Sequence, residues 1–203
     1  MIVPAYQMAD KELVKKWEKY VKNGGNLILT CRTAQKDRYG RLPETAFGAM
    51  IYDLTGNEVE FFDTLLPELP GKVTMDGKEY TWNTWGEVLK PLKETEIWAT
   101  YTDEFYEGKP AVTTRRLGKG SVTYIGVDSN DGTLEKDILK KLYTRFEIPV
   151  MDLPYGITLE YRNGLGIVMN YSDKPFEFTL PDGCKILIGD PKIPTAGVLV
   201  FKI

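Results

Sequence analysis

The apolar positions near the N-terminus first follow a helical period and then form an unbroken run. In DKELVKKWEKYVK, residues 10–22, apolar side chains recur every three or four positions on one helix face. After the Gly24-Gly25 pair, NLILTC at residues 26–31 predicts a strand that is buried on both sides. A helix, a glycine turn and a buried strand make half of a βαβ unit. The pattern therefore predicts an α/β fold, with a mostly parallel sheet and helices on both faces.

Short apolar runs in the middle of the chain predict further strands. VTMDGKEYTW has the pattern of a hairpin around Asp76-Gly77, a strong turn dipeptide. Three more strands are predicted at residues 97–101, 111–115 and 121–127. The helical period then returns over residues 133–146.

The segment Arg32–Glu44 has no apolar period and is rich in charged residues. It directly follows the predicted buried strand. We therefore expect a surface loop at the carboxyl end of a strand, the edge of an open α/β sheet where ligands or partners commonly bind.

The pattern of apolar and polar residues changes near Pro149. From Gly156 onward, short apolar runs such as ITLEYRNG, LGIVMNYSD and GVLVFKI alternate with Gly, Asp, Asn and Pro turns. Evenly spaced short strands of this kind predict a small antiparallel β-sandwich domain. The sequence thus predicts two domains, residues 1–149 and residues 150–203.

The composition excludes several classes of function. The net charge of -3 supplies no basic surface for nucleic acid or for an anionic membrane. No apolar stretch approaches the roughly 18 residues that span a bilayer, and MIVPAYQMADKELVKK has no visible signal-peptide pattern. The chain has two cysteines and hence no disulfide framework, so we expect a cytoplasmic location.

Cys31, at the end of the predicted buried strand, stands where a hydrolase could keep a nucleophile. The chain has no histidine, and this argues against such a role. A thiol has a pKa of about 8.5 and needs a basic neighbour, usually histidine, to react at neutral pH. Cys–His and Ser–His hydrolysis are therefore excluded, and zinc loses its commonest nitrogen ligand. We predict that Cys31 is a small buried residue, and we expect no metal or cofactor site.

Carboxylates are frequent in the predicted loops, but none of them stands out as catalytic. Glycoside hydrolysis needs two carboxyl groups about 5–10 Å apart, one of them with a raised pKa, and the spacing identifies no such pair. Gly118-Lys119-Gly120 joins two predicted strands rather than leading into a helix, which favours a hairpin turn over a phosphate-binding loop. The residues themselves predict no catalytic group.

Aromatic residues gather in a polar, turn-rich stretch of the chain. Trp82, Trp85 and Trp98 are candidates for a sugar-binding platform. Phe105 and Tyr106 follow in a predicted loop, where aromatic side chains favour a subunit interface. Core packing is the alternative for each of these residues.

Three segments carry a family resemblance: YVKNGGNLILTCRTAQKDRYGR, IYDLTGNEVEFFDTL with its Gly56 and Glu60, and WATYTDEFYEGKPAVTTRRLGKGSVTYIG. In this order they resemble the trimerisation domain of glycoside hydrolase family 42 β-galactosidases. The tail, with GIVMNYSDKPFEFTLPDG, is similar to the small C-terminal β domain of the same enzymes. The resemblance covers nearly the whole chain.

The resemblance implies a glutamine-amidotransferase-like, flavodoxin-like fold that holds three subunits together. It also implies that the two catalytic glutamates belong to a separate (β/α)8 barrel, a fold of some 200 residues or more. We therefore expect a non-catalytic assembly region of an enzyme that hydrolyses terminal β-galactosides. Its partners are expected to be further copies of itself and a catalytic barrel, in the same chain or in another.

The resemblance gives the polar loops a role at subunit contacts rather than in chemistry. The interface candidates are Arg32, Lys36, Asp37, Arg38, Phe105 and Tyr106. Two other hypotheses stay open on the sequence. One is a stand-alone carbohydrate-binding module that uses the tryptophans, and the other is a small hydrolase on an amidotransferase-like fold.

Overall fold

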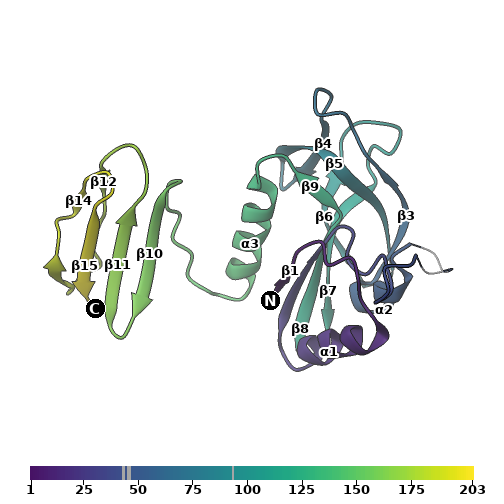
Figure 1. Cartoon of the computed structure of the whole chain (residues 1–203), viewed down its shortest axis with the longest axis horizontal. Coiled ribbons are helices and arrows are strands. Elements are labelled where there is room, and N and C mark those ends of the chain that lie inside the picture. The colour runs from purple at the N-terminus through teal and green to yellow at the C-terminus, as the bar shows by residue number, and fades with distance from the viewer. Residues whose placement is uncertain (43, 45–46, 93) are drawn as a thin grey trace. The chain divides into compact units, whose positions relative to one another are not determined.

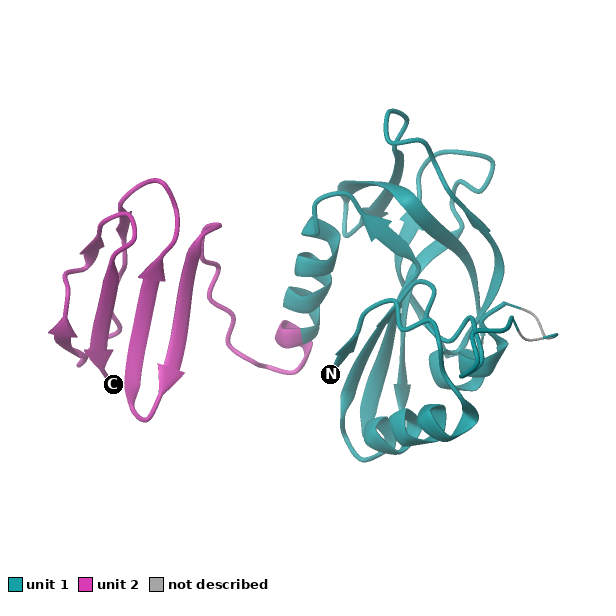
Figure 2. Cartoon of the chain, viewed as in Figure 1, with its two compact units in different colours: residues 1–142 teal, residues 143–203 magenta. Residues whose placement is uncertain are grey.

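The computed structural model describes residues 1–42, 44, 47–92 and 94–203. The chain divides into two compact units, Met1–Leu142 and Tyr143–Ile203 (Figure 2). The division falls inside helix α3 (Thr133–Arg145), whose last residues group with the second unit. The boundary predicted at 149/150 lies a few residues later in the chain.

The first unit is built on one nine-stranded sheet with helices packed against it (Figure 1). Its elements before α3 are β1 (Ile2–Val3), α1 (Lys11–Lys22), β2 (Asn26–Thr30), η1 (Ala49–Ile51), α2 (Tyr52–Thr55), β3 (Asn57–Asp63), β4 (Gly71–Met75), β5 (Lys78–Pro91), β6 (Glu96–Tyr101), β7 (Pro110–Leu117), β8 (Gly120–Ile125) and β9 (Val127–Ser129). The strand order is β1-β2-β8-β7-β6-β4-β5-β3, and β9 pairs with β5.

The sheet is mixed, and its parallel part is one edge. The pairs β1/β2 and β2/β8 are parallel, whereas the pairings among β3 to β9 are antiparallel. Tight turns explain this, because Asp76-Gly77 joins β4 to β5, and Gly118-Lys119 joins β7 to β8. Such short connections can only link antiparallel neighbours. The expectation of a mostly parallel sheet holds at the β1–β2–β8 edge and is corrected for the rest.

Helix α1 covers one face of the parallel edge. Asp10 is its N-cap, and the Asp10 side chain accepts the backbone N–H of Leu13 at 2.8 Å. Its buried residues, Trp17 and Val21, pack with apolar side chains of β2 and β8 such as Tyr124 in one core cluster. The amphipathic period read from the sequence therefore identifies the correct inner face.

Helix α3 lies on the opposite face of the sheet. Tyr124 pairs with Thr113, and Thr113 pairs with Ile97, so these three side chains face the α1 side. Trp98, the next residue after Ile97, points to the other face, and there the ammonium of Lys141 from α3 lies 5.0 Å from its ring centroid. The prediction of helices on both faces is confirmed.

The second unit is antiparallel throughout its described pairings, as predicted. It has a four-stranded sheet in the order β10-β11-β15-β13 and a two-stranded sheet of β12 and β14. Its strands are β10 (Ile157–Arg162), β11 (Leu165–Asn170), β12 (Phe176–Glu177), β13 (Lys185–Ile188), β14 (Lys192–Ile193) and β15 (Val198–Lys202). Val168, Phe178, Leu199 and Phe201 are among its core residues. A Cβ at Gly166 would lie 2.2 Å from the Phe201 ring, so only glycine leaves room for that ring.

Candidate functional site

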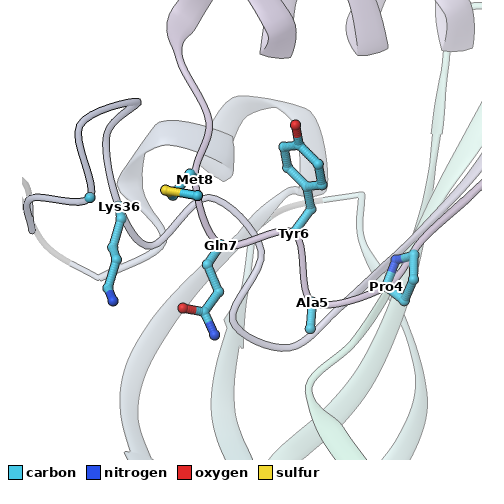
Figure 3. Close-up of a pocket in the computed structure, with 7 residues that line it drawn as sticks. Pro4, Ala5, Tyr6, Gln7, Met8 and Lys36 are labelled. Atoms are coloured by element: carbon cyan, nitrogen blue, oxygen red, sulfur yellow. The ribbon is translucent and has the colours of Figure 1, made fainter.

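The loop after β2 is tied to the N-terminal segment by backbone hydrogen bonds. The N–H groups of Ala34 and Lys36 donate to the carbonyls of Tyr6 and Gln7, both at 2.9 Å. Figure 3 shows this segment beside Lys36, where the two chain stretches line a pocket of ≈ 430 Å³. Lys36, one of the interface candidates, is thus held in place by its own backbone.

Asp37 organises the tip of this loop. Its carboxylate accepts the backbone N–H groups of Tyr39 at 2.8 Å and Arg41 at 2.9 Å, and the Arg41 Nε lies 3.3 Å away. These contacts, led by the backbone N–H of Arg41, lower the pKa of Asp37. Tyr39 is 73% exposed, and the guanidinium carbons of Arg38 and Arg41 lie 5.9 and 5.2 Å from its ring centroid. The tip therefore presents one aromatic ring flanked by two cations.

A fully buried carboxylate, Glu87 of β5, lies behind the loop with 0% of its surface exposed. Its Oε1 accepts the backbone N–H of Arg32 at 2.8 Å, Trp85 Nε1 at 3.0 Å and Gln35 Nε2 at 3.4 Å. Its Oε2 accepts the Tyr124 hydroxyl at 2.6 Å. Burial raises the pKa of Glu87, and the four hydrogen bonds oppose that rise. Glu87 thus connects the start of the loop to β5 and β8.

Arg32 is held at the root of the loop rather than at its surface. Its φ is 66°, in the left-handed region that residues with a Cβ avoid. Its guanidinium lies 4.7 Å from the Trp85 ring centroid, and the Phe62 ring stacks on Trp85 with a centroid distance of 4.4 Å. The hydrogen bond from Arg32 to Glu87 holds this conformation in place. Of the four charged interface candidates in the loop, Arg32 is therefore the one built into an internal stack.

Cys31 is buried at the end of β2, next to this network. Burial raises the pKa of its thiol strongly, and the negative charge of Glu87 adds to the rise. The thiol is therefore protonated at neutral pH and shielded from substrates. The prediction that Cys31 is a small buried residue is confirmed.

The loop between β6 and β7 carries both aromatic interface candidates, and it exposes one of them and buries the other. Phe105 is 83% exposed and stacks on Phe61 at a centroid distance of 5.5 Å. Tyr106 is only 2% exposed and donates its hydroxyl to Asp63 at 2.9 Å. The expectation for Tyr106 is corrected, because it is a core residue that supports Phe105, with the two rings 4.9 Å apart.

The three tryptophans proposed as a sugar platform are mostly inside the unit. Trp82 and Trp98 are buried, so they present no ring face to a sugar. Trp85 is half-buried and already contacts Phe62 and Arg32. The sugar-platform expectation is corrected for Trp82 and Trp98, and Trp85 is the one partly exposed member of the set.

Sequence reasoning missed two residues that shape this region, Glu87 and Tyr39. Glu87 stands in WGEVLK, directly before two apolar residues of a strand, and a carboxylate in such a run is a signal of burial. Tyr39 stands between Arg38 and Arg41, where an aromatic among cations indicates an exposed ring that stacks with them.

Among the residues with defined positions, 1–42, 44, 47–92 and 94–203, no group of three or more His, Cys, Asp or Glu side chains could hold a metal ion. No helix within these ranges is long and apolar enough to cross a membrane.

Comparison with known families assigns both units. Residues 1–153 match the family described as the beta-galactosidase trimerisation domain, and residues 156–202 match the beta-galactosidase C-terminal domain. The chain belongs to the glycoside hydrolase family 42 β-galactosidases. The resemblance carried by three ordered segments is confirmed, and both matched regions are non-catalytic domains of that family.

Individual β-galactosidases are similar to this chain in sequence and in structure. The chain is 28% identical to the β-galactosidase BgaH of Haloferax lucentense over 193 residues, which is 95% of this chain and 29% of that protein. It is 34% identical to the β-galactosidase LacA of Lactobacillus acidophilus over 126 residues, 62% of this chain and 19% of the relative. The solved β-galactosidase of the haloarchaeon Halorubrum lacusprofundi matches with a TM-score of 0.87 and 26% identity, over 100% of this chain and 31% of that one. The chain thus spans less than a third of the length of these relatives.

Proposed function

We propose that this chain is the assembly region of a β-galactosidase and that it holds three catalytic barrels together as a trimer. The single observation that carries the proposal is the match of residues 1–153 to a trimerisation domain. The relatives are about three times as long, so the catalytic glutamates are expected in a barrel outside these residues, in the same polypeptide or in a partner. The parent enzyme would hydrolyse terminal β-galactosides.

The interior of the chain supports an assembly role rather than chemistry. The thiol of Cys31 is protonated and buried, and the carboxylate of Glu87 is enclosed by four hydrogen-bond donors. Neither group can reach a substrate, so we propose that this chain alone is not an enzyme. The parallel β1–β2–β8 edge, and helices on both faces of the sheet, support an amidotransferase-like arrangement without an amidotransferase site. The free thiols of Cys31 and Cys184 favour a reducing, cytoplasmic location.

The surface supports an interface at the two loops that the sequence singled out. Lys36, Asp37 and Arg38 lie on the loop after β2, and Phe105 projects from the loop between β6 and β7. A large exposed aromatic ring held by a stack beneath it is the kind of residue that carries binding energy at interfaces. Phe105 is therefore the proposed anchor of the subunit contact.

Truncation of Phe105 tests the proposal. Phe105→Ser removes an exposed ring and leaves the buried Tyr106 in place, so we expect the unit to stay folded while the trimer weakens at least about 10-fold. Light scattering coupled to size exclusion measures the mass over a dilution series. Tyr155→Ser, which changes a still more exposed aromatic in the second unit, is the matched control and should stay trimeric. A Phe105→Ser chain that dissociates at the same concentration as wild type would contradict the placement of the interface.

A further inference from the structure

A closed trimer needs two different surfaces on each copy. Three identical chains around a threefold axis associate head to tail, so one surface of each copy meets a second, complementary surface of the next. The two surfaces described next rest on the proposed trimer. The partner of each surface is a second copy of this chain.

The sheet topology brings two loops to the same edge. β2 runs parallel to β8, β7 runs antiparallel to β8, and β6 runs antiparallel to β7. The end of β2 and the β6–β7 connection therefore lie at one end of the sheet, with β8 between them. With strands about 4.8 Å apart, the two loop origins are separated by about 10–15 Å. An edge of this kind can face a threefold axis and present one loop to each neighbour.

The first loop, residues 32–41, is basic. It carries four cationic side chains and one carboxylate, and the carboxylate of Asp37 is used internally to shape the tip. The side chains of Arg38 and Arg41 are 67% and 73% exposed on either side of Tyr39. The basic loop therefore ends in an exposed ring between two cations.

The second loop, residues 103–109, is acidic. Its one cation, Lys109, pairs with Glu60 at 3.1 Å, and Asp103 accepts the backbone N–H of Lys72 at 3.1 Å. Glu104 and Glu107 flank the exposed Phe105, and neither makes an ion pair with any residue that has a defined position. The acidic loop therefore ends in an exposed ring between two carboxylates.

We infer that the basic loop of one copy docks on the acidic loop of the next, with Tyr39 and Phe105 at the centre of the contact. The charges are opposite, and where the structure is defined no ion pair or ring contact joins residues 32–41 to residues 103–109 within one copy. Complementary charge fixes which surfaces meet and suppresses like-with-like pairing. Both tips are ordered in advance, by the Asp37 hydrogen bonds and by the Phe105 stack, so docking costs little conformational entropy.

Charge reversal in the full 203-residue chain tests this pairing. One variant carries Arg38→Glu and Arg41→Glu, and a second carries Glu104→Lys and Glu107→Lys. Each is expected to lower the mass from three chains to one, about a threefold loss measured by light scattering. The chain that combines both pairs of changes restores opposite charges across the contact and should return to three chains.

A matched control for the first variant carries Lys185→Glu and Lys192→Glu, which make the same change of charge as Arg38→Glu and Arg41→Glu on exposed positions of the second unit. It should remain trimeric. If both reversals leave a wild-type trimer intact, or if the combined variant does not reassociate, the loop-to-loop pairing is overturned while the proposed trimer stands. That result would favour a neighbouring barrel as the partner of these loops. A wild-type chain that is monomeric would overturn the proposed function and this pairing together.

Discussion

Replacement of Glu87 by alanine tests how the assembly surface is held in place. The variant removes the acceptor of three short hydrogen bonds, from the backbone N–H of Arg32, the Trp85 indole and the Tyr124 hydroxyl. The fourth donor, Gln35, is 3.4 Å away and contributes least. Arg32 follows β2, Trp85 lies on β5 and Tyr124 lies on β8, and the carboxylate joins these three parts of the chain.

The expected cost is large because one donor, the Tyr124 hydroxyl, is buried and the other two are partly buried. A buried donor without a partner costs about 1–3 kcal/mol, so roughly 3–9 kcal/mol is the upper range for the three. Removal of the carboxylate also relieves its own desolvation, and comparable breaks in buried charged networks cost about 3–5 kcal/mol. We expect Glu87→Ala to lose about 3–5 kcal/mol of the unfolding free energy, a large share of the 5–15 kcal/mol that is usual for a domain.

Urea unfolding followed by tryptophan fluorescence measures this loss. All four tryptophans, Trp17, Trp82, Trp85 and Trp98, lie in the first unit, so the signal reports that unit alone. Glu79→Ala is the matched control, because Glu79 lies on the same strand but is exposed in an ion pair with Lys72. It should cost less than about 1 kcal/mol. A Glu87→Ala variant that unfolds at the same urea concentration as the control would refute the argument.

Three further predictions concern the same interior. Burial raises the folded-state pKa of Glu87 above its ordinary value of 4.5, so wild type should be most stable relative to Glu87→Gln below about pH 4.5. That advantage should be lost as the pH rises through the folded-state pKa. A difference in unfolding free energy between wild type and Glu87→Gln that stays constant from pH 4 to pH 8 would contradict this prediction. In a Cys184→Ser background, a thiol reagent should label Cys31 only after denaturation, and rapid labelling of the native chain would show that the site is open. Tryptophan emission should not change with millimolar β-galactosides, because Trp85 already stacks within the chain, whereas a saturable change would support carbohydrate binding.

Local patterns predicted the parts of the fold that depend on local signals. The helix over residues 10–22 and the strand at 26–31 are confirmed because the apolar period and the glycine turn agree there. The hairpins at Asp76-Gly77 and Gly118-Gly120 are confirmed as well, because a tight turn is a local signal of an antiparallel pair. The antiparallel pairings β3/β5, β4/β6 and β6/β7 are not predicted, because no tight turn joins those strands.

The position of the candidate loop in the sequence was predictable, but the burial of its individual side chains was not. The charged segment after β2 was recognised as a loop at a strand end, because it lacks any apolar period. The burial of Tyr106 and the exposure of Phe105 were not separable, since adjacent aromatics in a loop give no periodic signal. Glu87 was missed for a different reason: its partners, Arg32 and Tyr124, are far from it in sequence and meet it only in the fold.

The most direct test of the central claim is the mass of the wild-type chain in solution. Light scattering coupled to size exclusion distinguishes one chain of 23.1 kDa from an assembly of three. We expect a mass three times that of the single chain, which persists on dilution to micromolar concentration. A single-chain mass at every concentration would contradict the claim that this region assembles by itself.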